Sequence, residues 1–337
     1  MTNFTKKYQT AIIGLGHQAL EDHIPACLQS DDINLVAVVE KDKKRLNDFL
    51  KEYKKIKGYN SMEQLLKNNK LDFVIITAPH FIHYELTKKA LDKNIHVLKE
   101  KPFAISLKEA KKLANIAKKK KLIIGTTLQR RFNPIYSTFT QFIDKIGHPF
   151  YIDIKYTFYT EDPYSGWRGK KELAGGGCLL DMGYHVTDLL MWYFDMPNKI
   201  FAEFSSSAKE NIFYNAEDTA QVLFKYDNKE LWGSMLISRV IPPKQEYFHV
   251  YGTRGIIKLE RGKIELYKSN GELHESLKRD YAWPSAAQDQ LEYFVKVISG
   301  KKKNISNPNF HFKHLAFIEA AYESNQTKKY TNPKKFI

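Results

Sequence analysis

The chain has 337 residues, of which 43% are hydrophobic and 13% aromatic, a composition that excludes a disordered protein and leaves room for two domains. The 53 basic residues outnumber the 38 acidic ones and give a formal net charge of +15, but only eight of the basic residues are arginine. Direct reading of bases depends largely on arginine, and no aromatic residues interleave the lysine runs. We therefore expect a lysine-rich solvated surface and no nucleic-acid partner.

The same sequence argues against a membrane or extracellular location. Apolar runs such as LVAVV and FVIITA have the length of strands, whereas a membrane span needs about 18 apolar residues. No apolar signal-peptide core precedes the first strand, which predicts a cytoplasmic protein without a membrane partner. The two cysteines, Cys27 and Cys178, belong to no C-x-x-C pair, so neither a disulfide framework nor a thiolate zinc site is expected.

A glycine-rich turn follows the first predicted strand, residues 8–13. The sequence GLGHQA at 14–19 has the G-x-G-x-x-A pattern. In such a turn Gly14 permits the tight bend, Gly16 lets backbone amides approach a pyrophosphate, and Ala19 lets the next helix pack closely on the strand. This order of strand, turn and helix predicts a dinucleotide site.

The second predicted strand, INLVAVVE, ends at Glu40, 21 residues beyond Ala19. An acid at this distance accepts hydrogen bonds from the adenosine ribose of a dinucleotide. Its charge also repels a 2′-phosphate, which predicts NAD as the cofactor. The basic residues directly after it, beginning with Lys41, can neutralise such a phosphate, so NADP is the alternative.

Strands and amphipathic helices continue to alternate up to residue 127, the expected end of a first domain over residues 1–127. This alternation predicts an α/β Rossmann fold with a doubly wound parallel sheet. Because ligands bind at the carboxyl ends of such strands, the loops APHFIH (78–83) and EKPF (100–103) should share one edge with the glycine-rich turn. The predicted strands are 72–78, 96–100 and 122–127, and the predicted helices are 61–68, 83–92 and 106–119.

Residues 128–337 have a different pattern and predict an α+β second domain. The segments 150–159 and 246–267, with the alternation of Val222 and Phe224 between them, indicate strands without intervening helices and hence a largely antiparallel open sheet. Helices of the domain cover one face of such a sheet, so we expect the other face to meet a second copy in a homodimer or homotetramer. The predicted helices are 134–145, 285–299 and 311–324.

Three glycines at 175–177 lead into an apolar helical stretch that carries two polar residues, Asp181 and His185. Helical spacing of four residues places them on one face. Histidine can accept the proton of a secondary alcohol because its ordinary pKa lies near neutral pH, and a neighbouring carboxylate can orient the imidazole. Lys101 would supply positive charge to the alkoxide or carbonyl oxygen. The alternative is a polar pair that serves the packing of its helix.

Together these motifs resemble the Gfo/Idh/MocA family of oxidoreductases, which includes glucose–fructose oxidoreductase and inositol dehydrogenase. The resemblance covers nearly the whole chain. Two departures concern cofactor contacts: family members usually have T-P-N where this chain has Ala78, Pro79 and His80, and Asp where it has Glu40. The motifs, in family order, are GLGHQA, APHFIH, EKP, QRRFNP (129–134), WR (167–168), GGGCLLDMGYH (175–185) and GTRG (252–255).

The resemblance implies Lys101, Asp181 and His185 as catalytic residues, the same three that the chemistry requires. It also implies a cis peptide bond after Lys101. Arg131 suits a structural salt bridge as well as a substrate contact, and Asp188 suits a structural partner. The implied substrate contacts are Arg131, Trp167, Arg168, Asp181 and His185.

The cofactor implied by the resemblance is NAD, with NADP as the alternative. His80 and His83 have the spacing of a metal pair, but no further ligands accompany them, so no metal is expected. His83 is better suited to framing the nicotinamide pocket. The implied cofactor contacts are Gly14, Gly16, His17, Gln18, Ala19, Glu40, Lys41, Ala78, Pro79, His80, His83, Glu100 and Lys101.

These expectations describe an NAD(P)-dependent oxidoreductase that transfers hydride between a nicotinamide and a secondary alcohol or ketone of a carbohydrate-like substrate: a sugar, an inositol or a sugar derivative. The alternative is a non-catalytic sensor or scaffold of the same fold that binds the cofactor only, but such a protein needs none of the three catalytic residues. A nucleic-acid-binding regulator is a third class, and the sequence offers no element that would read bases.

Overall fold

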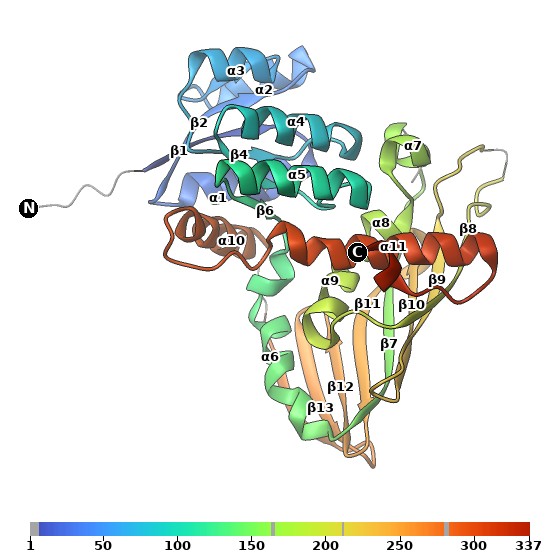
Figure 1. Cartoon of the computed structure of the whole chain (residues 1–337). Coiled ribbons are helices and arrows are strands. Elements are labelled where there is room, and N and C mark those ends of the chain that lie inside the picture. The colour runs from blue at the N-terminus through green and yellow to red at the C-terminus, as the bar shows by residue number, and fades with distance from the viewer. Residues whose placement is uncertain (1–6, 163–165, 211, 280–282) are drawn as a thin grey trace, which may run out of the picture. The chain divides into compact units, whose positions relative to one another are not determined.

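The computed structural model describes residues 7–162, 166–210, 212–279 and 283–337, and these form two compact units (Figure 1). The first unit comprises the described parts of Met1–Ala104, Lys108–Phe132 and Ala282–His311. The second comprises the described parts of Ile105–Leu107, Asn133–Tyr281 and Phe312–Ile337. The chain thus returns to its first unit near the end, whereas the sequence predicted two contiguous domains that meet at residue 128.

The return is made by α10 (Trp283–Ile298), which is part of the core of the first unit. Leu291, Phe294 and Val295 of this helix are buried in one cluster with Phe73 of the central sheet. Apolar periodicity identified α10 as a helix, but periodicity does not tell which sheet a helix packs against.

The first unit contains a six-stranded sheet in the order β3-β2-β1-β4-β5-β6, and every pairing in it is parallel. This is the doubly wound sheet that the sequence predicted. The order reverses between β1 and β4, the point at which ligands of such sheets bind outside the strand ends. The strands are β1 (Tyr8–Ile13), β2 (Ile33–Val39), β3 (Lys57–Tyr59), β4 (Phe73–Ile76), β5 (His96–Lys99) and β6 (Ile124–Thr126).

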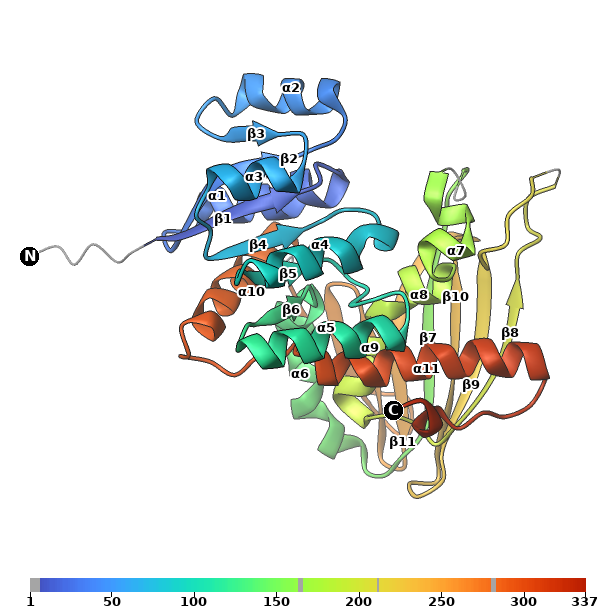
Figure 2. The ribbon, with the colours of Figure 1, turned by 45° about the horizontal axis from the view of Figure 1, so that its top comes forward.

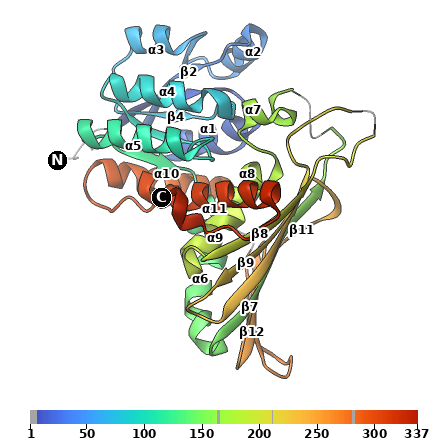
Figure 3. The same cartoon turned by 45° about the vertical axis from the view of Figure 1, so that its right-hand side comes forward.

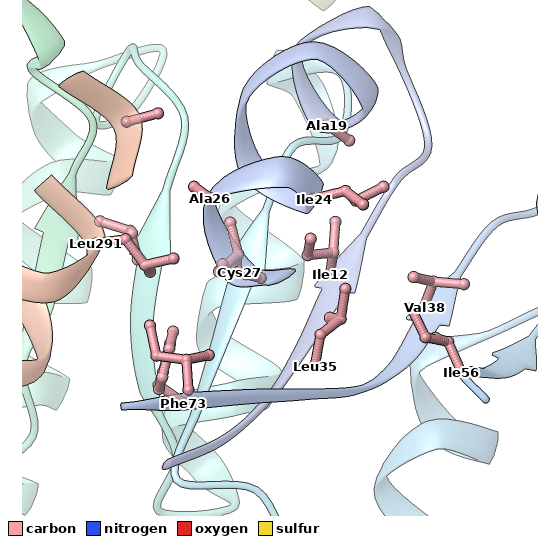
Figure 4. Packing of buried hydrophobic residues seen from close by; sticks show 14 of the residues in the cluster. Ile12, Ala19, Ile24, Ala26, Cys27, Leu35, Val38, Ile56, Phe73 and Leu291 are labelled. Carbon is pink, nitrogen blue, oxygen red and sulfur yellow. The ribbon is translucent and has the colours of Figure 1, made fainter. Parts of the chain in front are cut away.

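Helices cover both faces of this sheet, which is why all four residues of β4 are buried. On one face α1, α2 and α10 join a cluster that includes Ile12, Val38 and Phe73 (Figure 4). On the other face α4 packs against β4 and β5, and α5 lies beside α4 (Figure 2). The remaining elements are a π-helical turn η1 (Ala19–His23), α1 (Ile24–Gln29), α2 (Lys43–Glu52), α3 (Met62–Asn68), α4 (His80–Asp92), α5 (Leu107–Lys120) and η2 (Gln129–Phe132).

The second unit contains an eight-stranded sheet in the order β14-β13-β12-β11-β7-β10-β9-β8. Only β7 and β10 pair in parallel, and the other pairings are antiparallel, so the predicted largely antiparallel sheet is confirmed. The strands are β7 (Pro149–Tyr159), β8 (Lys199–Ser205), β9 (Thr219–Tyr226), β10 (Leu231–Ser238), β11 (Val240–Gly252), β12 (Gly255–Glu260), β13 (Lys263–Lys268) and β14 (Leu273–Lys278).

The two faces of this sheet differ in cover (Figure 3). One face packs against helices and buries alternate residues such as Ile152 and Ile154. The opposite face is aromatic: the ring of Tyr151 lies 4.6 Å from that of Trp232, whose surface is half exposed, and 5.7 Å from that of Tyr251. The helices are α6 (Pro134–Phe142), η3 (Ile143–Ile146), η4 (Gly166–Gly169), α7 (Lys171–Ala174), α8 (Cys178–Asp181), α9 (Gly183–Phe194), α11 (Pro308–Thr327) and η5 (Pro333–Phe336).

In the described part of the chain, no helix combines the length and apolarity that crossing a membrane requires.

Candidate active site

The glycine-rich turn follows β1 and contacts the ends of its two neighbouring strands, β2 and β4. Gly14 has a φ of +101°, a left-handed conformation that favours glycine, and its N–H donates to Val39 O at 2.8 Å. A Cβ on Gly14 would lie 3.1 Å from the backbone nitrogen of Ala78 at the end of β4. The turn therefore needs glycine here both for its bend and for its contact with the neighbouring strand end.

The far side of the turn is open, as a bound pyrophosphate requires. A Cβ built on Gly16 would meet no atom within 4 Å. His17, Gln18 and Lys41 are exposed, and Ala19 is fully buried under the helix that follows. Backbone amides are thus accessible above a closely packed helix start, and the residues present fit a dinucleotide.

Glu40 lies beside the turn although the chain separates them. Its Oε2 accepts a hydrogen bond from Leu15 N at 2.9 Å, and its Oε1 accepts one from Asp42 N at 3.0 Å. Arg45 Nη1 lies 3.5 Å from Oε2, with half of its side chain exposed. The carboxylate is therefore fixed at the glycine turn, and its contact with a ribose stays a prediction.

His83, in the first turn of α4, holds the loop after β4. It is 1% exposed, and its Nε2–H donates to Ala78 O at 2.7 Å. Burial, followed by the charges of Lys99 and His80, lowers the pKa of His83 well below its ordinary value. His83 is therefore a neutral hydrogen-bond donor to the loop that carries Ala78 and Pro79.

At the end of β5, Glu100 pairs with a residue that the sequence analysis did not select. His23 Nε2 lies 2.8 Å from Glu100 Oε1, and both side chains are largely buried. Burial raises the pKa of Glu100, but the hydrogen bond and charge of His23 and the charge of Lys101 bring the pKa below its ordinary value. The peptide bond between Lys101 and Pro102 is cis, as the resemblance implied. Glu100 thus ties the segment of Lys101 to η1, directly beyond the glycine turn.

Lys99, the residue before Glu100, is fully buried. Its Nζ donates to Phe103 O at 2.8 Å, which closes the segment that contains Lys101. Burial lowers the pKa of Lys99 to about 7, and the charge of Glu109 opposes that shift. A lysine inside the apolar run HVLKE was the available signal for this residue, because lysine is almost never fully buried.

In the second unit, the three consecutive glycines lie where the chain touches three different segments. A Cβ on Gly175, whose φ is +80°, would lie 2.4 Å from Ile105 Cβ. A Cβ on Gly176 would lie 2.3 Å from Tyr322 Oη, and one on Gly177 would lie 2.1 Å from Glu217 O. Real Cβ atoms do not approach so closely, so packing within this unit alone accounts for the glycines.

Asp181 and His185 follow these glycines on two helices that meet at Met182. Asp181 is the last residue of α8, and His185 lies in the first turn of α9, its N–H donating to Met182 O at 3.2 Å. Two guanidinium groups face Asp181 Oδ2, with Arg168 Nε and Arg239 Nη2 each 3.6 Å away. The carboxylate therefore carries ion pairs of its own.

A pocket of about 250 Å³ opens beside Asp181. Arg239, at its wall, has a side chain that is only 5% exposed, whereas that of Arg168 is about half exposed and stacks on Trp167, with 4.4 Å from the guanidinium carbon to the ring centroid. Sequence reasoning missed Arg239, and an arginine directly after an alternating strand was the only signal. The pocket is lined by Phe158, Thr160, Asp162, Arg168, Asp181, Met182 and Arg239.

Two candidate residues have structural partners. The Arg131 guanidinium donates to Ile305 O at 2.9 Å and lies over the ring of Phe310, structural contacts of another kind than the salt bridge that the sequence suggested. Asp188 Oδ1 lies 2.9 Å from His314 Nε2, and both side chains are buried. Among the described residues, no three His, Cys, Asp or Glu side chains converge as a metal site would require.

Comparisons with known proteins identify the family of this chain. Residues 8–128 match the model of an oxidoreductase family, described as GFO_IDH_MocA with an NAD-binding Rossmann fold, and residues 140–258 match the GFO/IDH/MocA C-terminal domain. D-glucoside 3-dehydrogenase of Escherichia coli is 24% identical, with 95% of each chain covered. The NADP⁺-dependent scyllo-inositol 2-dehydrogenase of Bacillus subtilis is 21% identical, with 95% of this chain and 94% of that protein covered.

A solved structure shows the same fold. The WlbA dehydrogenase of Bordetella pertussis, solved in complex with NADH and UDP-GlcNAcA, superposes with a TM-score of 0.82. The two sequences are 18% identical, and the match covers 97% of this chain and 99% of that one.

Replacing Lys99 with methionine should remove a pH dependence of stability. The pKa of Lys99 is about 7 in the folded chain against an ordinary 10.5, so between these values the unfolded chain holds a proton that the folded chain lacks. The contribution of Lys99 to the free energy of unfolding therefore rises with pH across this window, by about 1.4 kcal/mol per pH unit. Urea unfolding at pH 7, 8 and 9 should show wild type gaining stability relative to Lys99→Met as the pH rises.

The control is Lys118→Met, which removes an exposed lysine of α5. It should leave the pH dependence of wild type unchanged. If the Lys99→Met and wild-type stabilities run parallel from pH 7 to 9, the buried ammonium keeps its charge and the lowered pKa is wrong.

Proposed function

Since the chain belongs to the Gfo/Idh/MocA family of oxidoreductases, whose N-terminal domain is an NAD-binding Rossmann fold, we propose that it is a nicotinamide-dependent carbohydrate dehydrogenase. The reaction is the oxidation of a secondary hydroxyl of a sugar, an inositol or a sugar derivative, or the reduction of the corresponding ketone. The two relatives named for a glucoside and for an inositol support this substrate class.

The observation that carries the substrate class is the pocket beside Asp181. Each hydroxyl of a polyol both donates and accepts hydrogen bonds. Arg168 and Arg239 supply donors, Asp162 and Asp181 supply acceptors, and Thr160 supplies both. The formal charges of the two arginines and two aspartates cancel, which suits a neutral, polyhydroxylated molecule better than an apolar ketone.

The chemistry assigns one role to each of three side chains. His185 accepts the proton of the reacting hydroxyl, or returns it to the alkoxide in the reverse direction. Asp181 accepts a hydrogen bond from the substrate or from the imidazole, and its Oδ2 lies 3.6 Å from each of the two guanidinium groups. Lys101 places a positive charge at the oxygen on which negative charge develops. A bound nicotinamide supplies the hydride acceptor or donor.

A screen of NAD⁺ and NADP⁺ reduction against polyols, sugars and sugar phosphates tests the proposal. Turnover of at least one carbohydrate is expected, with a kcat in the usual enzymatic range of about 1 to 10³ per second. A protein that binds the dinucleotide but turns over none of these substrates in either direction would be a sensor or scaffold, and the enzyme assignment would fall.

His185→Ala should lose most of the turnover while cofactor binding survives. General acid–base catalysis typically contributes about 10²- to 10⁴-fold, so a loss of that size in kcat is expected. Lys101→Met should lose a comparable factor and also weaken substrate binding, because the proposal assigns its charge to the reacting oxygen. Steady-state kinetics beside a fluorescence titration of NADH provide the measurement.

Matched controls are His274→Ala and Lys118→Met, both at exposed positions. They should retain wild-type kcat. Near wild-type turnover in His185→Ala and Lys101→Met would show that the helix after the glycines serves packing and that catalysis depends on other residues.

Glu40 should make NAD the preferred cofactor, because its fixed carboxylate would repel a 2′-phosphate at the ribose. The ratio of kcat/KM for NAD to that for NADP should exceed one in wild type and fall in Glu40→Ala. The exposed Glu85→Ala on α4 serves as the control and should leave the ratio unchanged. A tenfold NADP preference of wild type, about 1.4 kcal/mol, would show that Arg45 and the neighbouring lysines dominate.

The aromatic face of the second unit's sheet should join two copies of the chain. Light scattering should give about twice or four times the chain mass of 39.3 kDa. Trp232→Glu, which places a charge in this face, should lower the mass, whereas Phe213→Glu, at a position that is 96% exposed, should not. A mass of one chain for wild type at micromolar concentration would contradict the proposal.

A further inference from the structure

Glu217 is a buried acid that the chemistry above does not use. It lies just before β9, and only 4% of it is exposed. Acids are almost never buried to this extent unless they are paired. Burial raises the pKa of Glu217, while hydrogen bonds from Tyr322, Leu179 and Gly177 oppose the shift. The hydrogen-bond partners of this carboxyl group therefore indicate its role.

Those partners lie at the start of α8. Glu217 Oε2 accepts from Gly177 N at 2.8 Å, and Oε1 accepts from Leu179 N at 3.1 Å. The backbone contributes as well, because Glu217 O accepts from Cys178 N at 2.8 Å. One residue thus satisfies three successive N–H groups that a helix start leaves without intrahelical partners.

A side chain from another helix completes the arrangement. Tyr322 Oη of α11 donates to Glu217 Oε2 at 2.6 Å, and Gly177 N lies 3.0 Å from the same Oη. Gly177 itself is fixed in place, since a Cβ there would lie 2.1 Å from Glu217 O and 2.7 Å from the Glu217 carboxyl carbon. The beginning of α8 is therefore held from two sides at hydrogen-bonding distance.

The held segment leads directly to the candidate catalytic residues. Asp181 N donates to Gly177 O at 3.1 Å, so the last residue of α8 is bonded to the glycine that Glu217 holds. Met182 N in turn donates to Cys178 O at 2.9 Å, and His185 follows within one turn of α9. A shift of the first turn of α8 would be passed along these bonds to both side chains.

We propose that Glu217, with Tyr322, is a positioning residue that sets the orientation of Asp181 and His185, a role that rests on the function proposed above. Glu217 acts through the backbone of α8 and touches neither substrate nor cofactor. A carboxylate is needed because three donors converge on its two oxygens. A glutamine has one accepting oxygen in this place, and its amide would direct N–H groups at one or more of the same donors.

Glu217→Gln should therefore reduce kcat by about tenfold to a hundredfold, the effect expected of a small misplacement of reacting groups. The affinity for NADH should stay within about twofold of wild type, because every contact described here lies in the second unit. The pH profile of kcat should also move, since the imidazole of His185 would sit differently against Asp181. Tyr322→Phe, which removes one donor and leaves both backbone bonds, should show the same changes at smaller size.

The control is Glu203→Gln on β8. The side chain of Glu203 is about half exposed and forms an ion pair with Lys328. It should leave kcat, the pH profile and NADH affinity unchanged. Assays are run well below the unfolding midpoint of each variant, as measured by circular dichroism. If Glu217 only stabilised the fold, Glu217→Gln would lower the unfolding midpoint but leave kcat and its pH profile intact. That result would overturn the proposal.

Titration of the His185 ring by NMR, assigned with His185→Ala, supplies a readout that needs no turnover. Glu217→Gln should shift the midpoint of this titration, and an unchanged midpoint would overturn the proposal even if the substrate screen finds no substrate. If Glu217→Gln fails to fold, Tyr322→Phe decides by the same measurements. Failure of the proposed function would appear as a wild type without activity in the substrate screen. Failure of the positioning role would appear as an unchanged His185 titration in Glu217→Gln.

Discussion

The architecture of the second unit depends on one steric constraint, the contact between the backbone of Gly177 and that of Glu217. With 2.1 Å between a Cβ at Gly177 and Glu217 O, only glycine can occupy this position. The contact brings the first N–H groups of α8 onto a buried carboxylate, and the N–H groups of Asp181 and Met182 donate in turn to the carbonyls of Gly177 and Cys178. The positions of Asp181 and of the first turn of α9 follow from where this helix begins, and Arg168 and Arg239 face Asp181 from other segments.

The first unit uses buried ionisable groups in a related way. Lys99 bonds to the carbonyl of Phe103, and His83 bonds to the carbonyl of Ala78. Each holds a loop at the carboxyl end of a parallel strand, where the topology of the sheet places ligand contacts. Such groups have a cost, because burial disfavours their charged forms. They are tolerated where a backbone carbonyl must be held and no secondary structure supplies a donor.

The distribution of charge separates surface from site. The net charge of +15 comes from a lysine-rich composition, and the lysines of the described residues are spread over helices, strands and loops, mostly at exposed positions. The pocket beside Asp181 instead combines two arginines with two aspartates, and its formal charge is zero. Arginine rather than lysine suits this place, because its planar group presents several donors in fixed directions and loses less freedom for each hydrogen bond. The charge of the whole chain is thus a poor guide to the chemistry of the site.

The sequence by itself determined the two kinds of sheet, the position of the glycine turn and the acid that lies beside it. These follow from local rules: periods of two and of about 3.6 residues, and turns that demand glycine. Tertiary structure alone decided that α10 packs in the first unit and that Arg239 faces Asp181. It also decided that Glu217 and Tyr322 meet at Gly177, 40 and 145 residues apart in the chain. Contacts between residues so far apart leave no periodic pattern, because they depend on how whole elements pack and not on the order of neighbouring residues.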